Sequence, residues 1–150
     1  IAPLAFTKAT DQQIREVSAI THAHALFCDA CVVYVQLLRD LAGGMPVARA
    51  VAKLPSEGRL GRLSSMASVP HEQVKSSGFV VDTFEAAVWT LATTGNYRDC
   101  VTAVVELGQD SDTVGAVAGA LVGVVYGYDA IPAEWIEALR GKDIIESCLF

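Results

Sequence analysis

The most apolar stretch of the chain runs from Gly108 to Gly127 and reads GQDSDTVGAVAGALVGVVYG. Its apolar part is shorter than the roughly 20 residues that a membrane-spanning helix needs. Within it, glycine recurs every fourth residue, at Gly115, Gly119 and Gly123, and small residues at this spacing allow neighbouring helices to approach closely. The stretch therefore predicts a central helix that is buried in an all-α protein rather than in a membrane.

Two carboxylates, Asp110 and Asp112, and the hydroxyl of Thr113 stand where this apolar stretch begins. Asp and Thr are good N-cap residues, and acids suit the positive end of a helix dipole. Capping uses one acid, however, and a second ionised carboxylate beside a buried segment is costly unless something positive meets it. Oxygen ligands of this kind favour a hard cation such as Mg²⁺, Ca²⁺ or Mn²⁺. The residues thus leave two alternatives, a helix cap and a metal site.

An EF-hand calcium loop does not fit these residues. Counted from Asp110, the fifth and twelfth positions of the motif fall on Val114 and Leu121, where an oxygen ligand and a glutamate are needed. Only Gly115 matches its expected position. A metal site here would need further ligands from elsewhere.

The composition favours one domain built from closely packed helices. The chain has 150 residues, enough for a single core, of which 52% are hydrophobic, and its mean hydropathy is +0.38. Aromatic residues make up only 7%, so the core must consist mainly of Ala, Val, Leu and Gly. A β-sandwich would instead be rich in Thr, Tyr and Ile. We expect a single all-α domain over residues 1–150.

Helix start and stop signals divide the chain into about seven or eight helices. Residues 10–13 have the form of a capping box, and Thr21 is placed to cap a long helix that stops at Gly43. Residues 55–78 lack a long periodic run and are expected to form a surface segment with room for one short helix. The other expected helices begin near Pro46, Val81, Tyr97, Val114, Ile131 and Asp143.

Charge and cysteine content narrow the choice of partner and compartment. The net charge is −6, from 17 acids and 11 bases, which argues against nucleic acid because phosphate binding needs a basic surface. Cys28 and Cys31 form a CxxC without a second pair at zinc-ribbon spacing. Buried thiols on one helix are the favoured interpretation, and a zinc site that includes His24 is the alternative. We expect a reducing, cytoplasmic setting and no membrane.

Common catalytic signatures are missing from the sequence. It contains no G-x-S-x-G, no HExxH and no glycine-rich loop followed by Lys, so acyl transfer and P-loop chemistry have no support. Taken alone, His22 is more simply a structural histidine, and Asp82 is an ordinary N-cap followed by acidic and polar first-turn residues.

Four stretches nevertheless resemble the ADP-ribosylglycohydrolase family, which includes the dinitrogenase-reductase-activating glycohydrolases and the ADP-ribosylarginine hydrolases. They follow one another in the family's order over essentially the whole chain, and Asp-Ser-Asp-Thr-Val-Gly-Ala is the most specific piece. The stretches are Ile1–Leu4, Ser18–His22, Gly78–Thr83 with Glu85–Ala87 and Trp89, and Gly108–Gly119 with Tyr126–Gly127 and Ile131–Trp135.

The resemblance implies an all-α hydrolase that uses two divalent cations, usually Mg²⁺ or Mn²⁺, to release ADP-ribose from a modified protein side chain or a small acceptor. It makes Asp110, Asp112 and Thr113 metal ligands and His22 a substrate contact. Phe79 stands where many members have Tyr, so the implied substrate contact is apolar rather than through a hydroxyl. Two cations at such a site can orient ribose hydroxyls and a water, and can lower the pKa of that water.

The resemblance also implies that the chain is the C-terminal half of the family's single domain. The partner ligands, a Thr-Asp-Asp run, the acid that assists the water and a Gly-Ser-Met-Arg loop would lie upstream of Ile1. No catalytic residue is therefore expected in this half, which by itself should be inactive. A non-catalytic structural or ADP-ribose-binding relative is the alternative. Uncovered apolar faces predict association with the N-terminal half or formation of a homo-oligomer.

Overall fold

The structure is a computed structural model that describes residues 1–148. These residues form eight α-helices and five 3-10 helices and contain no strand, so the all-α prediction is confirmed. The α-helices are α1 (Asp11–Ala19), α2 (Ala25–Ala42), α3 (Val47–Ala52), α4 (Val80–Thr93), α5 (Tyr97–Glu106), α6 (Ser111–Tyr126), α7 (Ala133–Ala138) and α8 (Lys142–Ser147). The 3-10 helices are η1 (Ala2–Phe6), η2 (Gly58–Leu60), η3 (Leu63–Ser68), η4 (His71–Gln73) and η5 (Tyr128–Ala130).

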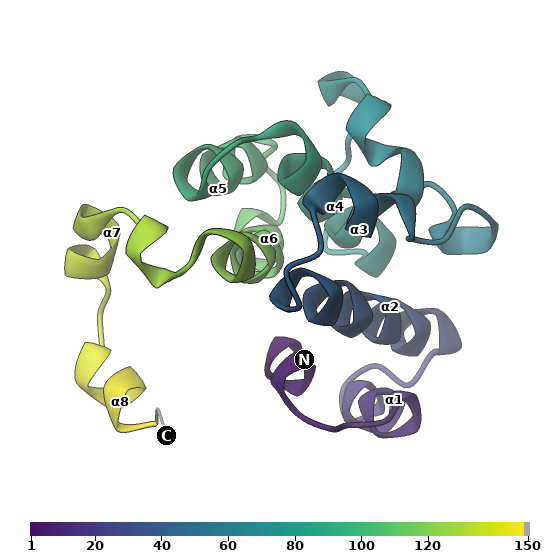
Figure 1. Ribbon diagram of the computed structural model, residues 1–150, viewed down its shortest axis with the longest axis horizontal. Coiled ribbons are helices and arrows are strands. Elements are labelled where there is room, and N and C mark those ends of the chain that lie inside the picture. Colours follow the sequence, from purple (N-terminus) through teal and green to yellow (C-terminus); the bar gives the residue numbers. More distant parts are fainter. Residues whose placement is uncertain (149–150) are drawn as a thin grey trace.

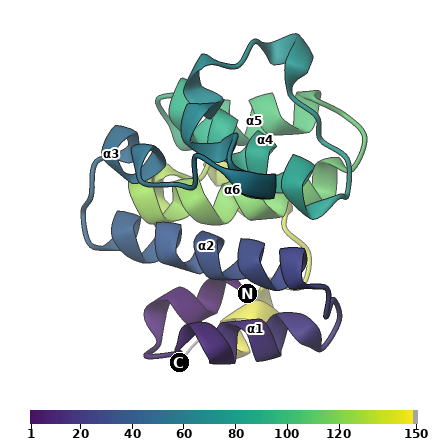
Figure 2. The ribbon, with the colours of Figure 1, turned by 90° about the vertical axis from the view of Figure 1, so that its right-hand side faces the viewer.

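Helices α2, α4 and α5 pack around α6, which lies at the centre of the bundle (Figure 1, Figure 2). The inward face of α6 is fully buried at Val114, Ala118 and Leu121, as the apolar stretch predicts. Helix α4 is buried more completely, because nine of its 14 residues are buried compared with four of the 16 in α6. Among residues 1–148, no helix combines the length and the apolar character that crossing a bilayer would require.

The glycines of α6 lie on its α5 side. A Cβ built at Gly119 would lie 3.4 Å from the hydroxyl of Tyr97, and one at Gly123 would lie 3.9 Å from Cε2 of the same ring. These are ordinary van der Waals separations, so the helices approach closely yet leave room for a methyl group. Gly127 has a different role, because it ends the helix with φ of 83°, a conformation that favours glycine.

The capping box at residues 10–13 is present, but the prediction that Thr21 caps α2 is wrong. The hydroxyl of Thr21 instead bonds Nδ1 of His22 at 2.9 Å. Helix α2 starts after His24, whose Nδ1 accepts the N–H of Leu26 at 3.1 Å. The connection between α1 and α2 is consequently longer than expected, and it carries His22.

Residues 55–78 contain η2, η3 and η4 rather than one short helix. Leu63 and Met66 of η3 are fully buried, and Trp89 of α4 donates its Nε1–H to the carbonyl of Val69 at 3.0 Å. The segment is therefore fastened to α4 by apolar and polar contacts, although its glycines and prolines prevent a long helix.

Helices α7 and α8 follow α6 through η5, and Figure 1 shows α8 set apart from the remaining helices. Helix α7 is attached to α5 by the ion pair of Arg98 with Glu134 and by the ring of Trp135, which lies 5.3 Å below the Arg98 guanidinium. Helix α8 begins at Lys142 after Gly141, one residue before the predicted start.

Candidate functional site

The N-terminal ends of α2, α4 and α6 meet at one end of the bundle. Phe27, in the first turn of α2, contacts Phe79, the N-cap of α4, with 6.0 Å between ring centroids. Gly78 precedes Phe79 and lies against the side chain of Asp110, the N-cap of α6. The ring of His22 is stacked on that of Phe27. The residues predicted from three separate stretches are thus brought together.

The acidic segment differs from the prediction that its helix begins near Val114. Helix α6 begins at Ser111, so Asp112 and Thr113 belong to its first turn. Asp110 is the N-cap by position, but its side chain makes no capping hydrogen bond. Asp112 uses one carboxylate oxygen to accept the N–H of Thr113 at 2.9 Å. The capping alternative therefore accounts for neither carboxylate in full.

The two carboxyl groups of Asp110 and Asp112 influence each other directly. The pKa of Asp112 is lowered, first through its interaction with the Asp110 carboxyl group and second through the N–H of Thr113, which donates to it. When both carboxyl groups are ionised they repel each other, and a cation bound between them would offset that repulsion.

The donor set fits a hard divalent cation, because it consists of two carboxylates and a hydroxyl. Asp110 is half-buried, while Asp112 and Thr113 are exposed. Within residues 1–148, no group of three or more His, Cys, Asp or Glu side chains is placed to hold a metal. Since Mg²⁺ takes six ligands in near-octahedral geometry, these three residues would supply only part of a coordination sphere.

Asp110 is held in place by the loop that precedes α4. Ser76, which is 1% exposed, donates its hydroxyl to the carbonyl of Gly108 at 3.0 Å. The N–H of Asp110 donates in return to the carbonyl of Ser76 at 3.1 Å. Gln109 between them has φ of 55°, a left-handed conformation that non-glycine residues adopt at a cost. The conformation of the turn that carries Asp110 is therefore fixed by its hydrogen bonds to the loop that precedes α4.

Ser77 fastens this loop to the first turn of α4. Its hydroxyl donates to a carboxylate oxygen of Asp82 at 2.6 Å and accepts the N–H of Phe79 at 3.3 Å. The hydroxyl of Thr83 donates to the Ser77 carbonyl at 3.0 Å. The expectation that Asp82 is the N-cap of this helix is wrong, because Phe79 occupies that position and Asp82 is already helical.

His22 and Phe79 both reach solvent at this end of the bundle. His22 is exposed in the connection between α1 and α2, and Phe79 is 39% exposed. The half-buried Phe27 between them was not predicted as a site residue. The sequence signal that could have identified Phe27 is an aromatic residue in the first turn of the helix that follows the candidate residue His22.

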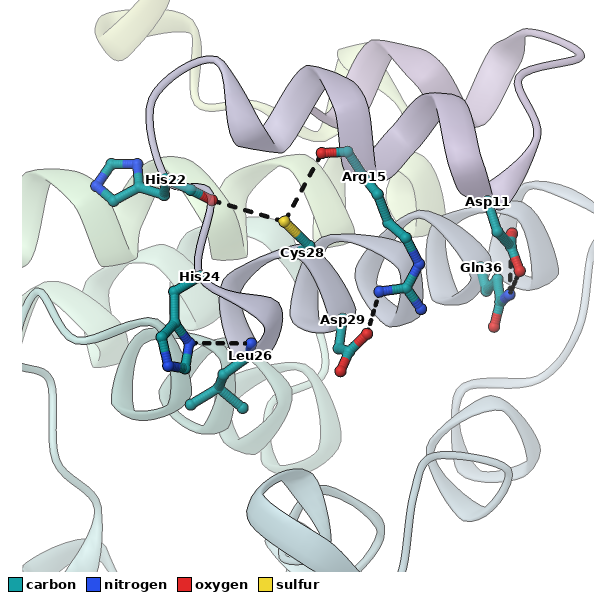
Figure 3. A network of polar contacts seen from close by, with 8 residues as sticks. All are labelled: Asp11, Arg15, His22, His24, Leu26, Cys28, Asp29 and Gln36. Atoms are coloured by element: carbon teal, nitrogen blue, oxygen red, sulfur yellow. Dashed lines mark hydrogen bonds and ion pairs between the residues drawn. The ribbon is translucent and has the colours of Figure 1, made fainter.

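The thiols of Cys28 and Cys31 share α2, as predicted, and Cys28 is buried while Cys31 is half-buried. The Cys28 thiol contacts the carbonyls of Arg15 and His22, at 3.7 and 3.6 Å. Figure 3 shows both contacts and the separate role of His24, whose ring turns to the backbone of its own helix. The Cys28 thiol and the His24 ring therefore have structural roles at the junction of α1 and α2.

Comparison with known proteins gives a consistent result. The model of the ADP-ribosylglycohydrolase family matches residues 1–149. The chain is 38% identical over 76 residues to an ADP-ribosylarginine hydrolase of Serratia proteamaculans (strain 568), covering 51% of this chain and 21% of that protein. It is 33% identical over 125 residues to the ADP-ribosyl-(dinitrogen reductase) glycohydrolase of Rhodospirillum rubrum, covering 82% and 41%.

A solved structure described as an ADP-ribosylglycohydrolase-related protein complex has the same helical arrangement. It aligns with a TM-score of 0.78 at 29% sequence identity, covering 91% of this chain and 50% of that one. The chain therefore spans half or less of the length of each of these proteins.

Proposed function

The chain belongs to the ADP-ribosylglycohydrolase family, and on this premise we propose that the intact protein hydrolyses the bond between ADP-ribose and a modified protein side chain or small acceptor. The observation that carries the proposal is the meeting of Asp110, Phe79 and His22 at the N-terminal ends of three helices. One end of the bundle thus combines cation ligands with residues suited to bind the nucleotide portion of a substrate.

Asp110, Asp112 and Thr113 would hold a divalent cation, Mg²⁺ or Mn²⁺, together with ligands from outside this chain. When bound, such a cation supplies Lewis-acid activation of water and orientation of the ribose hydroxyls. The chain's own contribution is to preorganise the carboxylates. Ser76 is hydrogen-bonded to Gly108 and Asp110, and Gly78 leaves room for the Asp110 carboxylate, so the position of this ligand is defined by contacts between two loops.

The pyrophosphate of ADP-ribose finds donors at the same place. The first turns of helices leave main-chain N–H groups without intrahelical partners, and the positive ends of helix dipoles favour anions. A chain with a net charge of −6 can bind a phosphate-bearing ligand this way without a basic surface. His22 adds a hydrogen-bonding ring nitrogen, and Phe79 adds an apolar face.

The relatives suggest the substrate class to test first. One is named as a hydrolase of ADP-ribosylated arginine, and another as a hydrolase of ADP-ribosylated dinitrogen reductase. We therefore propose an ADP-ribosylated protein as the substrate. A relative that binds ADP-ribose without cleaving it is the alternative.

We also propose a reducing, cytoplasmic setting. It is supported by the four cysteines, all of which are free thiols, with Cys28 and Cys100 buried.

The direct test is the release of free ADP-ribose from an arginine-ADP-ribosylated protein by the intact enzyme, with Mg²⁺ or Mn²⁺ present. We expect Asp110→Ala to abolish both release and Mn²⁺ binding measured by titration calorimetry, while circular dichroism stays unchanged. Asp129→Ala, an exposed acid in η5, is the control and should keep full activity. Full activity of Asp110→Ala would contradict the role given to Asp110, and tight ADP-ribose binding without release would favour the non-catalytic alternative.

A further inference from the structure

We propose that Phe27 is a positioning residue that orients the ring of His22 and joins it to Phe79, forming one continuous surface toward the ADP-ribose moiety. The identity of the ligand rests on the proposed function. The positional relationship among the three rings rests on the geometry of the described residues alone.

The ring of Phe27 contacts both predicted substrate-binding residues. It lies parallel to the ring of His22, with an interplanar angle of 8° and 5.2 Å between centroids. It meets Phe79 edge-on, at 80° and 6.0 Å. Stacked and edge-to-face pairs at these separations are the favourable arrangements of aromatic rings. Phe27 is therefore the physical link between the α1–α2 connection and the start of α4.

His22 needs such a link because it is exposed and lies outside any helix. Its carbonyl accepts from the Cys28 thiol at 3.6 Å, and its Nδ1 bonds the Thr21 hydroxyl at 2.9 Å. Figure 3 shows the carbonyl pointing to Cys28 while the ring points away from it. The main chain and one ring edge are thus held by these two neighbours. The face of the ring is held by Phe27, which leaves Nε2 as the atom that can reach a ligand.

Placing this support on a helix has a functional consequence. Phe27 belongs to the first turn of the 18-residue helix α2, and groups held by helices keep their geometry better than groups on loops. A binding residue that can rotate freely loses rotamer entropy when the ligand arrives, whereas a pre-oriented one does not. Loss of the Phe27 ring should therefore weaken ligand binding without removing any group that touches the reacting atoms.

The first measurement reads the position of His22 without any ligand. In the intact protein labelled with ¹³C-histidine, the ring protons of His22 (assigned with His22→Gln) should show the upfield shift that a stacked aromatic ring causes. We expect Phe27→Ala and Phe27→Leu to lose this shift and Phe27→Tyr to keep it. Leu26→Ala removes a half-buried side chain from the same helical turn and serves as the matched control, with the shift retained.

The second measurement is kinetic. Phe27→Ala and Phe27→Leu should raise KM for the ADP-ribosylated protein about 3- to 10-fold, the value of one aromatic pair. Because the lost interaction is shared by ground and transition state, kcat should stay within about twofold. Phe27→Tyr should restore the wild-type KM, and thermal unfolding of each variant excludes a general loss of structure.

The outcomes test the positioning role of Phe27 and the proposed function separately. Unchanged His22 shifts and unchanged KM in Phe27→Ala would overturn the positioning role. An equal loss of the His22 shift in Leu26→Ala would overturn it as well, because Phe27 would then contribute only to the general packing of this helical turn. If the wild-type protein neither binds nor releases ADP-ribose, the proposed function fails, and the His22 shifts alone still decide whether Phe27 orients this ring.

Discussion

Gly78 lies so close to Asp110 that a Cβ built on the glycine would be only 2.5 Å from Oδ2 of the carboxylate. No real Cβ tolerates this separation. The two residues come from loops ahead of different helices, which are tied together by the hydrogen bonds of Ser76 with Gly108 and Asp110. The position of a proposed metal ligand is thus set by the absence of a side chain more than 30 residues earlier.

Replacing Gly78 by alanine should move the Asp110 carboxylate and weaken cation binding. The group that must yield is the end of a side chain, so the free energy of unfolding should change by less than about 1 kcal/mol. The affinity for Mn²⁺ in the intact protein should fall about 10- to 100-fold, as for other residues that orient metal ligands. Titration calorimetry and urea unfolding measure the two effects. Gly95→Ala, where an added Cβ meets nothing within 4 Å, should change neither, and unaltered Mn²⁺ binding by Gly78→Ala would refute the link.

Glu85 should make stability fall as the pH rises. Burial raises its pKa above the ordinary value of 4.5, although the Arg62 guanidinium at 2.9 Å opposes the shift. Between the lower unfolded pKa and the higher folded pKa, the folded state holds more protons, so its stability decreases with increasing pH. Urea unfolding at several pH values from about 4.5 upward should show a shallower decrease for Glu85→Gln. Arg62→Gln should steepen it, and identical slopes in all three proteins would disprove the assignment.

Gly123, inside α6, and Gly127, its C-cap, should respond oppositely to replacement by alanine. At Gly123 the added methyl group would meet Tyr97 at 3.9 Å, so Gly123→Ala should gain about 0.5–1 kcal/mol of stability from helix propensity. At Gly127 the φ of 83° strains any residue with a Cβ, so Gly127→Ala should lose about 1 kcal/mol or more. Thermal and urea unfolding of the two variants give the signs, and changes of equal sign would contradict this division of roles.

The 150-residue chain, prepared alone, should associate in solution. Phe6 is 67% exposed and Ile20 is 79% exposed, and both lie on the η1–α1 side of the molecule. Apolar side chains of this size at the surface favour intermolecular contact. Light scattering should report species larger than a monomer, and Ile20→Lys should reduce their proportion. A monodisperse wild-type monomer at high concentration would show that this surface is tolerated in water.

Helix periodicity and the residues that start and end helices predicted much of the local structure. The capping box at residues 10–13, the glycine that ends α6 and the buried face of that helix follow from local rules of helix formation. The N-caps of α2 and α4 were predicted wrongly at Thr21 and Asp82, whereas the expected start of α4 near Val81 lies one residue from its observed start at Val80. In both cases a hydroxyl or carboxylate with good capping chemistry was engaged by a neighbour, Nδ1 of His22 or the hydroxyl of Ser77. Local propensity does not reveal which of several partners a polar group will choose.

By itself, the sequence determined the helical class and, through its family resemblance, the candidate residues His22, Phe79, Asp110, Asp112 and Thr113. The helical class could be predicted because helix periodicity and capping act over a few neighbouring residues. Only the tertiary structure decided that the starts of α2, α4 and α6 meet, that Gly78 makes space for Asp110 and that Phe27 joins the rings of His22 and Phe79. These relationships are between residues far apart in the chain, and they exist only because the buried faces of the helices pack around α6.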